Sequence, residues 1–195
     1  MGKSTISSFA HHPLPITHHP LRRAVFLDRD GVINRCAVRN GKPYAPRRLE
    51  DFRLLPRAIA SVRALKRANF LVIVVTNQPD IGNGLVDGDT VEAMHQLLKQ
   101  RLQVDDIKVC PHRQDASCRC RKPKPGLLLE AARQWKIDLT NSYMVGDRCS
   151  DIVAGQSAGC YTIFINRGYR EGKCPKPDRM INSLPAAVRL ILSRR

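Results

Sequence analysis

The chain has 195 residues, the length of one ordinary domain, and can bury a hydrophobic core without the help of disulfides. Its longest clean apolar run, residues 70–75, is far shorter than the roughly 20 residues that a membrane-spanning helix needs, so we expect a soluble protein with no membrane partner. A formal net charge of +16 predicts attraction to something anionic, which a phosphorylated small molecule, a nucleic acid or a membrane surface would satisfy.

Residues 1–23 contain no acidic residue and no apolar core of the kind that a secretory signal requires. We interpret this segment as a flexible arm ahead of a single folded domain over residues 24–195. The seven cysteines are an odd number, and three of them lie within the eleven residues 110–120. This pattern indicates metal ligation in a reducing compartment rather than a set of disulfides, so the expected location is the cytoplasm.

The first two predicted strands are short buried runs that end in polar residues. Residues 24–27 are apolar and end abruptly in Asp-Arg-Asp-Gly at 28–31, as expected for a buried strand that delivers acids to a loop. Pro56 opens an amphipathic helix, because proline is well tolerated in a first turn. Residues 70–75 follow as the second buried strand and end in Thr-Asn-Gln at 76–78.

The rest of the chain continues to alternate helix and strand. A helix is predicted to begin with Asp89 as its N-cap, with Glu92 completing a capping box, and to reach about Leu102. The alternation predicts an α/β protein with a three-layer Rossmann-like fold, in which helices cover both faces of a central parallel sheet. The remaining predicted elements are strands at 107–109, 143–145 and 161–165 and helices at about 126–134, at 150–158 and after 185.

Four polar motifs follow predicted strands along the chain. In an open α/β sheet the carboxyl ends of the strands meet at one edge, where ligands bind, so the fold would bring these motifs together. An ordered set of this kind is hard to explain as structural turns. The motifs are Asp28-x-Asp30-Gly31, Thr76-Asn77, the region of Lys122, and Gly146-Asp147 with Asp151.

The ordered set resembles the signature of the haloacid dehalogenase-like phosphatases, which is Asp-x-Asp-Gly after the first strand, Ser or Thr after the second, a Lys and then a late acidic motif. The resemblance spans roughly residues 24–170. It implies a magnesium-dependent phosphatase, a phosphoric monoester hydrolase whose partner is an anionic small-molecule phosphate ester. The matches leave little room for an inserted domain, so we expect no large cap domain and an open site shaped by loops.

The resemblance implies roles in the reaction for five residues. Asp28 would be the nucleophile that forms an aspartyl-phosphate, and Asp30 the general acid and base that protonates the leaving group and later deprotonates water. Thr76 and the backbone around Asn77 would hydrogen-bond the transferring phosphoryl group. Lys122 would stabilise the negative charge of that group in the transition state.

The same resemblance places a magnesium ion on the carboxylates of Asp28 and Asp147 and on the backbone carbonyl of Asp30. Oxygen ligands suit this hard cation. For Asp151 three roles stay open: it supports the metal through water, it orients Lys122, or it caps the helix that begins nearby.

A second predicted metal site lies in the segment before Lys122. Cys110, His112, Cys118 and Cys120 offer three thiolates and an imidazole, spaced closely enough to complete a tetrahedral zinc site. Four protein ligands leave no open position, so this zinc is expected to be structural and to form a zinc-binding loop. The four cysteines without such neighbours are expected to be inert: Cys36, Cys149, Cys160 and Cys174.

The zinc-binding loop narrows the resemblance to the D-glycero-D-manno-heptose 1,7-bisphosphate 7-phosphatases and the histidinol-phosphate phosphatases. Both carry Cys-Pro-His and then Cys-x-Cys-Arg-Lys-Pro, as residues 110–123 do, whereas Ser-Tyr-Met-Val-Gly-Asp-Arg at 142–148 is more similar to the heptose enzymes. In those enzymes the residues that match Arg121 and Arg148 contact the substrate. The segments that depart from the heptose pattern, and that keep the histidinol alternative open, are 35–42 and 79–84.

A protein that binds nucleic acid or processes its ends is the alternative from another class, because of the net charge of +16 and the basic residues beside the zinc-binding loop. Against this alternative, only 5% of the residues are aromatic, the chain shows no recognition helix or stacking stripe, and the loop is unlike a tandem finger. Nucleic acid is therefore not an expected partner, and the chain is expected to act as a monomer.

Overall fold

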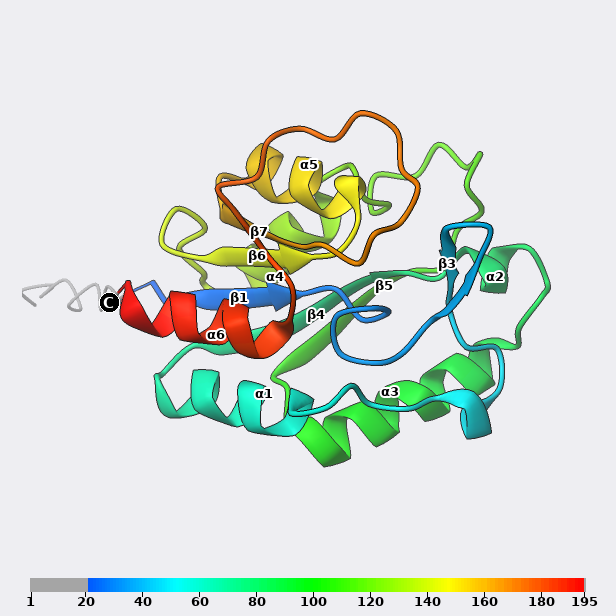
Figure 1. Ribbon diagram of the computed structural model, residues 1–195, viewed down its shortest axis with the longest axis horizontal. Coiled ribbons are helices and arrows are strands. Elements are labelled where there is room, and N and C mark those ends of the chain that lie inside the picture. Colours follow the sequence, from blue (N-terminus) through cyan, green and yellow to red (C-terminus); the bar gives the residue numbers. More distant parts are fainter. Residues whose placement is uncertain (1–20, 195) are drawn as a thin grey trace, which may run out of the picture.

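The computed structural model describes residues 21–194 (Figure 1). Of the predicted arm, only residues 21–23 lie within this range. The strands are β1 Ala24–Leu27, β2 Ala37–Arg39, β3 Lys42–Tyr44, β4 Leu71–Asn77, β5 Asp106–Cys110, β6 Tyr143–Gly146, β7 Tyr161–Ile165 and β8 Arg179–Ile181. The helices are η1 Leu49–Asp51, a 3-10 turn, and α1 Ala58–Arg67, α2 Pro79–Gly82, α3 Gly88–Leu102, α4 Gly126–Trp135, α5 Cys149–Ala158 and α6 Leu184–Ser193.

A six-stranded sheet forms the centre of the molecule, in the order β5-β4-β1-β6-β7-β8, and every strand pair in it is parallel. Strand β1 lies inside the sheet, between β4 and β6 (Figure 1). At its end, Leu27 is in register with Val74 on one side and Val145 on the other. The residues that follow these three strands therefore emerge side by side at one edge of the sheet.

Helices cover both faces of the sheet, with α1, α3 and α6 on one side and α4 and α5 on the other (Figure 1). Successive residues of β1 point to opposite faces: Val25 and Leu27 pack in the core beneath α1, α3 and α6, whereas Ala24 and Phe26 pack beneath α4 and α5. A strand that is buried on both faces is apolar throughout, which is why its sequence signal is clear. The predicted three-layer α/β fold is confirmed.

The sheet carries no cap domain in the part of the chain that the structure describes. The segment between β1 and α1 contains only a small hairpin and the 3-10 turn η1, and the segment after β4 contains the short helix α2. None of the helices within residues 21–194 has the length and apolarity to cross a membrane.

The hairpin of β2 and β3 and the edge strand β8 have no counterpart among the predicted elements. Each of these strands is three residues long and largely exposed, so none produces an apolar run. The hairpin turn is formed by Asn40 and Gly41, which have positive φ angles of 52° and 75°. Asn-Gly is a favoured sequence for such a turn, so this signal was present in the sequence.

Helix α3 begins earlier than predicted. Its N-cap is Asp87 rather than Asp89, and the Asp87 carboxylate accepts a hydrogen bond from the Asp89 N–H at 3.3 Å. The predicted capping box of Asp89 and Glu92 is therefore wrong. Two aspartates separated by one residue are equally suited to the N-cap, and the helix begins after the earlier one.

Two of the cysteines that were expected to be inert are paired. Cys149 and Cys174 form a disulfide, with their Cα atoms 5.1 Å apart, which ties the start of α5 to the loop between β7 and β8. Cys36 and Cys160 are free, as expected. The pairing was missed because the two residues are separated by 25 positions and only the fold brings them together.

Candidate active site

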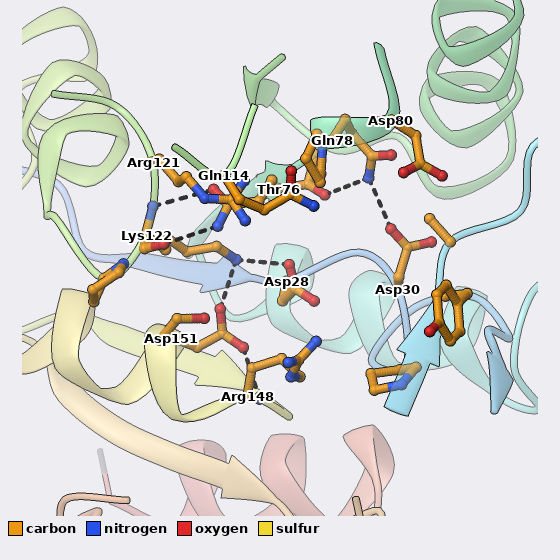
Figure 2. A pocket seen from close by; sticks show the side chains of 17 residues that line it. Asp28, Asp30, Thr76, Gln78, Asp80, Gln114, Arg121, Lys122, Arg148 and Asp151 are labelled. Carbon is orange, nitrogen blue, oxygen red and sulfur yellow. Dashed lines mark hydrogen bonds and ion pairs between the residues drawn. The ribbon is translucent and has the colours of Figure 1, made fainter. Parts of the chain in front are cut away.

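Asp28 lies in a cavity of about 520 Å³ at the carboxyl edge of the sheet (Figure 2). It follows β1 directly, and its backbone N–H donates to the Val145 carbonyl at 2.9 Å, which continues the sheet by one residue. The side chain is buried, and this burial raises the pKa of Asp28 to about 7, while the charge of Lys122 acts in the opposite direction. Burial therefore disfavours the negative charge of the Asp28 carboxylate, and a neighbouring positive charge is needed to stabilise it.

Lys122 provides the positive charge next to Asp28 (Figure 2). Its Nζ donates to Asp28 Oδ1 at 2.7 Å and to the Val75 carbonyl at 2.7 Å, and pairs with Asp151 Oδ1 at 2.6 Å. Burial lowers the pKa of this lysine, but the carboxylates of Asp151 and Asp28 outweigh that effect and hold the pKa above its ordinary value. Lys122 is thus a permanent cation between two acids.

The backbone of Lys122 is held by Asn77, which ends β4. The Asn77 side-chain amide donates to the Lys122 carbonyl at 3.0 Å, and its oxygen accepts from the Lys122 N–H at 3.1 Å. Asn77 was predicted to contact the substrate, and it does line the cavity. Its side-chain amide group, however, is engaged in fixing the segment that carries the lysine.

Two of the three roles left open for Asp151 are seen in the geometry. Its Oδ1 pairs with Lys122, which orients the lysine, and its Oδ2 accepts the Arg148 N–H at 3.0 Å, which caps helix α5. It also stands within reach of the other acids, because one oxygen each of Asp28, Asp147 and Asp151 lie within 4.8 Å of one another.

Three side chains hold the carboxylate of Asp30. Arg29 donates through Nε at 3.1 Å and Nη2 at 3.2 Å, Asn34 donates through Nδ2 at 2.8 Å, and Gln78 donates through Nε2 at 2.8 Å. The donors come from the same loop and from the end of β4, so the orientation of Asp30 is fixed from two directions. Sequence reasoning missed all three donors, because Arg29 is the variable position of the motif Asp28-x-Asp30-Gly31 and the other two lie outside the recognised motifs.

Gln78 also connects Asp30 to Thr76. Its amide nitrogen lies 2.8 Å from Thr76 Oγ1, and both side chains are almost completely buried. Because the threonine oxygen accepts this bond, its hydroxyl hydrogen is free to point into the cavity that Thr76 lines. Figure 2 shows Asp30, Gln78 and Thr76 as one connected chain of side chains.

Asp147 has the environment of a cation ligand. Both of its carboxylate oxygens are buried, and neither makes a hydrogen bond of good geometry among residues 21–194, although the Tyr169 hydroxyl lies beside the carboxylate. Burial and the neighbouring Asp28 raise the pKa of Asp147 well above its ordinary value. Two unpaired buried oxygens beside a second carboxylate fit a divalent cation with oxygen ligands.

Gly31 packs directly against the carboxylate of Asp147. A Cβ atom at this position would stand 1.8 Å from Asp147 Oδ2, and the backbone has a φ of +86°. Glycine is therefore required here both for its small size and for its backbone conformation.

Two arginines line the same cavity. One guanidinium nitrogen of Arg121, Nη1, is buried without a hydrogen-bond partner among the described residues, whereas the guanidinium of Arg148 is paired with Glu171. The hairpin contributes Pro43 and Tyr44 to the wall of the cavity. The cavity therefore contains the unpaired guanidinium nitrogen of Arg121, and the hairpin residues Pro43 and Tyr44 form part of its wall.

The four predicted zinc ligands are brought together beside the cavity. The Cys110 and Cys118 sulfurs are 3.7 Å apart, and His112 Nδ1 lies 3.5 Å from Cys110 Sγ and 3.2 Å from Cys120 Sγ. Two thiolates bound to one tetrahedral zinc at about 2.3 Å would be about 3.8 Å apart. The cluster fits a zinc ion, and it lies directly before Lys122 in the chain.

Comparison with known proteins identifies the family. The chain is 37% identical over 152 residues to a D-glycero-beta-D-manno-heptose-1,7-bisphosphate 7-phosphatase of Rhodopseudomonas palustris, covering 72% of this chain and 81% of that protein. It is 32% identical over 180 residues to the protein of the same name from Bordetella bronchiseptica, covering 87% and 98%. The chain belongs to this heptose bisphosphate phosphatase family.

Other comparisons agree with this membership. Residues 119–187 match the family model described as HAD-hydrolase-like, where HAD stands for haloacid dehalogenase. The crystal structure of the D,D-heptose 1,7-bisphosphate phosphatase from B. bronchiseptica, complexed with magnesium and phosphate, superposes with a TM-score of 0.79 at 30% identity and covers 89% of this chain and 99% of that one. The predicted membership of the haloacid dehalogenase-like phosphatases, and the prediction of a phosphoric monoester hydrolase, are confirmed.

Proposed function

We propose that this heptose bisphosphate phosphatase family member removes the 7-phosphate of D-glycero-D-manno-heptose 1,7-bisphosphate through an aspartyl-phosphate on Asp28. The observation that carries the proposal is the pairing of Asp28 with the buried Lys122 at 2.7 Å in a cavity that Asp30 also lines. Relatives named for this reaction are 32% to 38% identical to the chain over the aligned residues.

In the first step an oxygen of Asp28 attacks phosphorus, and the bond from phosphorus to the sugar oxygen breaks. Asp30 donates a proton to the departing sugar oxygen, so that an alcohol leaves rather than an alkoxide. The bonds from Arg29, Asn34 and Gln78 hold the Asp30 carboxyl group in place for this transfer. Asp30 is an anion after the step.

In the second step water attacks the phosphorus of the aspartyl-phosphate, and Asp30 removes a proton from that water. The Asp28 carboxylate leaves, inorganic phosphate is released, and Asp30 has regained its proton. Lys122 and the Thr76 hydroxyl stabilise the charge on the phosphoryl oxygens during both steps, because both groups are buried, already oriented and face the cavity.

The catalytic cation is proposed to be magnesium, held by the carboxylates of Asp28 and Asp147 and by the carbonyl of Asp30. The two unpaired oxygens of Asp147 support this assignment. When bound, magnesium supplies positive charge that offsets the repulsion between the carboxylate and the phosphate anion.

The second phosphate of the substrate is proposed to bind Arg121. A bisphosphate carries one phosphate that reacts and one that does not, and the unreacting phosphate needs its own cationic partner. Arg121 Nη1 is buried in the cavity wall and unpaired among the described residues, so it can take that role. Arg148 is proposed as a further contact at the edge of the cavity.

The zinc proposed at Cys110, His112, Cys118 and Cys120 is structural. Helix α4 begins against this loop: a Cβ atom on Gly126 would lie 2.1 Å from the carbonyl oxygen of Arg119. The metal would therefore fix the segment that places both Arg121 and Lys122 in the cavity.

The test is phosphate release in the presence of magnesium from three esters: the heptose bisphosphate, histidinol phosphate and an aryl phosphate. Wild type and Asp28→Asn are measured in parallel, since the variant controls for contaminating phosphatases. We expect the highest kcat/KM on the heptose bisphosphate and no activity in Asp28→Asn. Faster hydrolysis of histidinol phosphate than of the heptose bisphosphate would show that the enzyme is a histidinol-phosphate phosphatase. Activity that survives in Asp28→Asn would contradict the aspartyl-phosphate mechanism.

A further inference from the structure

A second cavity lies behind the loop that carries the proposed catalytic acids. It has a volume of about 380 Å³ and shares no lining residue with the active-site cavity. One wall is Val32, which follows Gly31 in that loop. The cavity is thus separate from the active site but in contact with the same loop.

Three arginines line this cavity: Arg57, Arg167 and Arg189. None of the lining residues is acidic, and none of the three arginines forms an ion pair with any residue in the range 21–194. Three positive charges in one cavity repel one another, and here no protein carboxylate compensates them. The cavity therefore has the charge of an anion site.

Two helix N-termini add to that charge. Arg57 and Ser183 are the N-caps of α1 and α6, and both flank the cavity. Neither helix has an acidic residue in its first turn or a side-chain hydrogen bond at its N-cap. The partial positive charges of both helix ends are therefore not offset by an acidic side chain, although the first N–H of α1, that of Ala58, donates to the Leu55 carbonyl at 3.2 Å. These charges act in the same direction as the arginines.

Arg167 connects the cavity to the catalytic loop. Its Nε donates to the Gly31 carbonyl at 2.9 Å, which leaves the two terminal nitrogens of the same guanidinium for a ligand. Arg57 and Arg189 are exposed side chains on the rim, so they can close on a ligand without rearrangement of the core.

We propose that this cavity binds the phosphate or diphosphate group of a small phosphorylated metabolite. Guanidinium groups bind phosphate oxygens in pairs of parallel hydrogen bonds, and the helix N-termini favour the same anions. The cavity is larger than an orthophosphate ion, and Leu55, Leu184 and Val32 give it an apolar side for the rest of the molecule. The site does not depend on which ester the active site hydrolyses.

Binding of inorganic pyrophosphate tests the proposal by isothermal titration calorimetry, in magnesium-free buffer of low ionic strength. Without magnesium the carboxylates of the active site repel the anion, so the wild-type protein should bind one pyrophosphate ion per chain, in the second cavity. The variant Arg57→Gln/Arg189→Gln should lose this binding, or bind at least about tenfold more weakly. The matched control, Arg63→Gln/Arg133→Gln, removes the same charge from exposed positions elsewhere and should bind as the wild type does.

Phosphatase activity and a thermal melt establish that each variant is folded with an intact active site. Arg189→Gln alone, a change at an exposed helix position, gives a second test if the backbone at Arg57, with its φ of 64°, does not tolerate substitution. A wild-type protein that binds no pyrophosphate would overturn the proposal. So would arginine variants that bind pyrophosphate with the affinity of the control.

Discussion

Arg29 donates a hydrogen bond from Nη1 to Nε2 of His95 at 3.0 Å, and both side chains are buried. Since arginine can only donate, the histidine must present a bare nitrogen and is neutral. The remaining nitrogens of Arg29 hold Asp30. His95, on helix α3, thus supports the proposed general acid and base through one intermediate residue.

The first prediction concerns stability and pH. Burial, reinforced by the charge of Arg29, lowers the pKa of His95 to about 4, whereas Glu92 on the same helix raises it slightly. Between pH 6.5 and 4 the unfolded chain binds a proton at this residue and the folded chain does not, so stability falls as pH falls. From pH 7 to pH 5 the loss due to His95 should be about 2 kcal/mol.

Urea unfolding of wild type and His95→Gln at pH 7 and pH 5 measures this loss. Glutamine keeps an acceptor for Arg29 but does not titrate, so the decrease in unfolding free energy between the two pH values should be smaller in the variant. Other titrating groups are common to both proteins and cancel in the difference. An equal decrease in both proteins would show that His95 is not held neutral by the fold.

The second prediction concerns Gln78, which donates to both Asp30 and Thr76 at 2.8 Å. Gln78→Leu removes both hydrogen bonds while it keeps the approximate size of the side chain. We expect kcat to fall about tenfold or more, because the acid and the threonine lose their fixed orientation, and KM to change little. Steady-state kinetics beside Gln100→Leu, an exposed glutamine on α3, measure the effect; equal kcat in the two variants would contradict it.

The third prediction concerns Lys122. Lys122→Met leaves Asp28 and Asp151 buried without their cation, so kcat should fall by about two to three orders of magnitude. The magnesium-free protein should lose about 3 kcal/mol of stability. An exposed lysine, changed in Lys173→Met, is the control.

The stability of the Lys122 variant should also depend on pH in a specific direction. Burial already raises the pKa of Asp28 to about 7, and loss of the lysine raises it further. An acid whose pKa is raised in the folded state destabilises that state as pH increases. Unfolding at pH 6 and pH 8 should therefore show a steeper loss with rising pH in the variant than in wild type, and parallel curves would contradict the pairing.

The fourth prediction concerns the zinc-binding loop. Cys118→Ser should reduce bound zinc below one ion per chain, lower the melting temperature and lower kcat, because the loop continues into Lys122. Elemental analysis, a thermal melt and kinetics are compared with Ser117→Ala in the same loop. Full activity in a zinc-free variant would show that the loop positions the lysine without metal.

The central fold could be predicted because its strands are buried on both sides. Residues 24–27 and 70–75 have no polar side chain, so their boundaries with Asp28 and Thr76 are clear. The strands of the hairpin and β8 contain no buried apolar run of this kind, since their side chains are largely exposed. A turn signal was present at Asn40 and Gly41, but hydrophobic periodicity does not detect it.

The residues of the candidate site also fall into those that the sequence could predict and those that it could not. Residues that belong to short motifs, such as Asp28 and Asp147, could be named from sequence. Residues that hold those motifs in place could not, because Gln78 and His95 are far in sequence from the residues that they contact, and only the fold brings them together. The disulfide between Cys149 and Cys174 is missed for the same reason.

The hairpin of β2 and β3 forms a separate two-stranded sheet, yet it supplies Pro43 and Tyr44 to the wall of the cavity. Among residues 21–194 its strands pair only with each other, so we expect replacement of its residues to leave the six-stranded sheet and the acids behind β1 in place. We therefore expect changes in the hairpin to alter which ester is accepted and to leave the phosphoryl chemistry at the end of β1 intact.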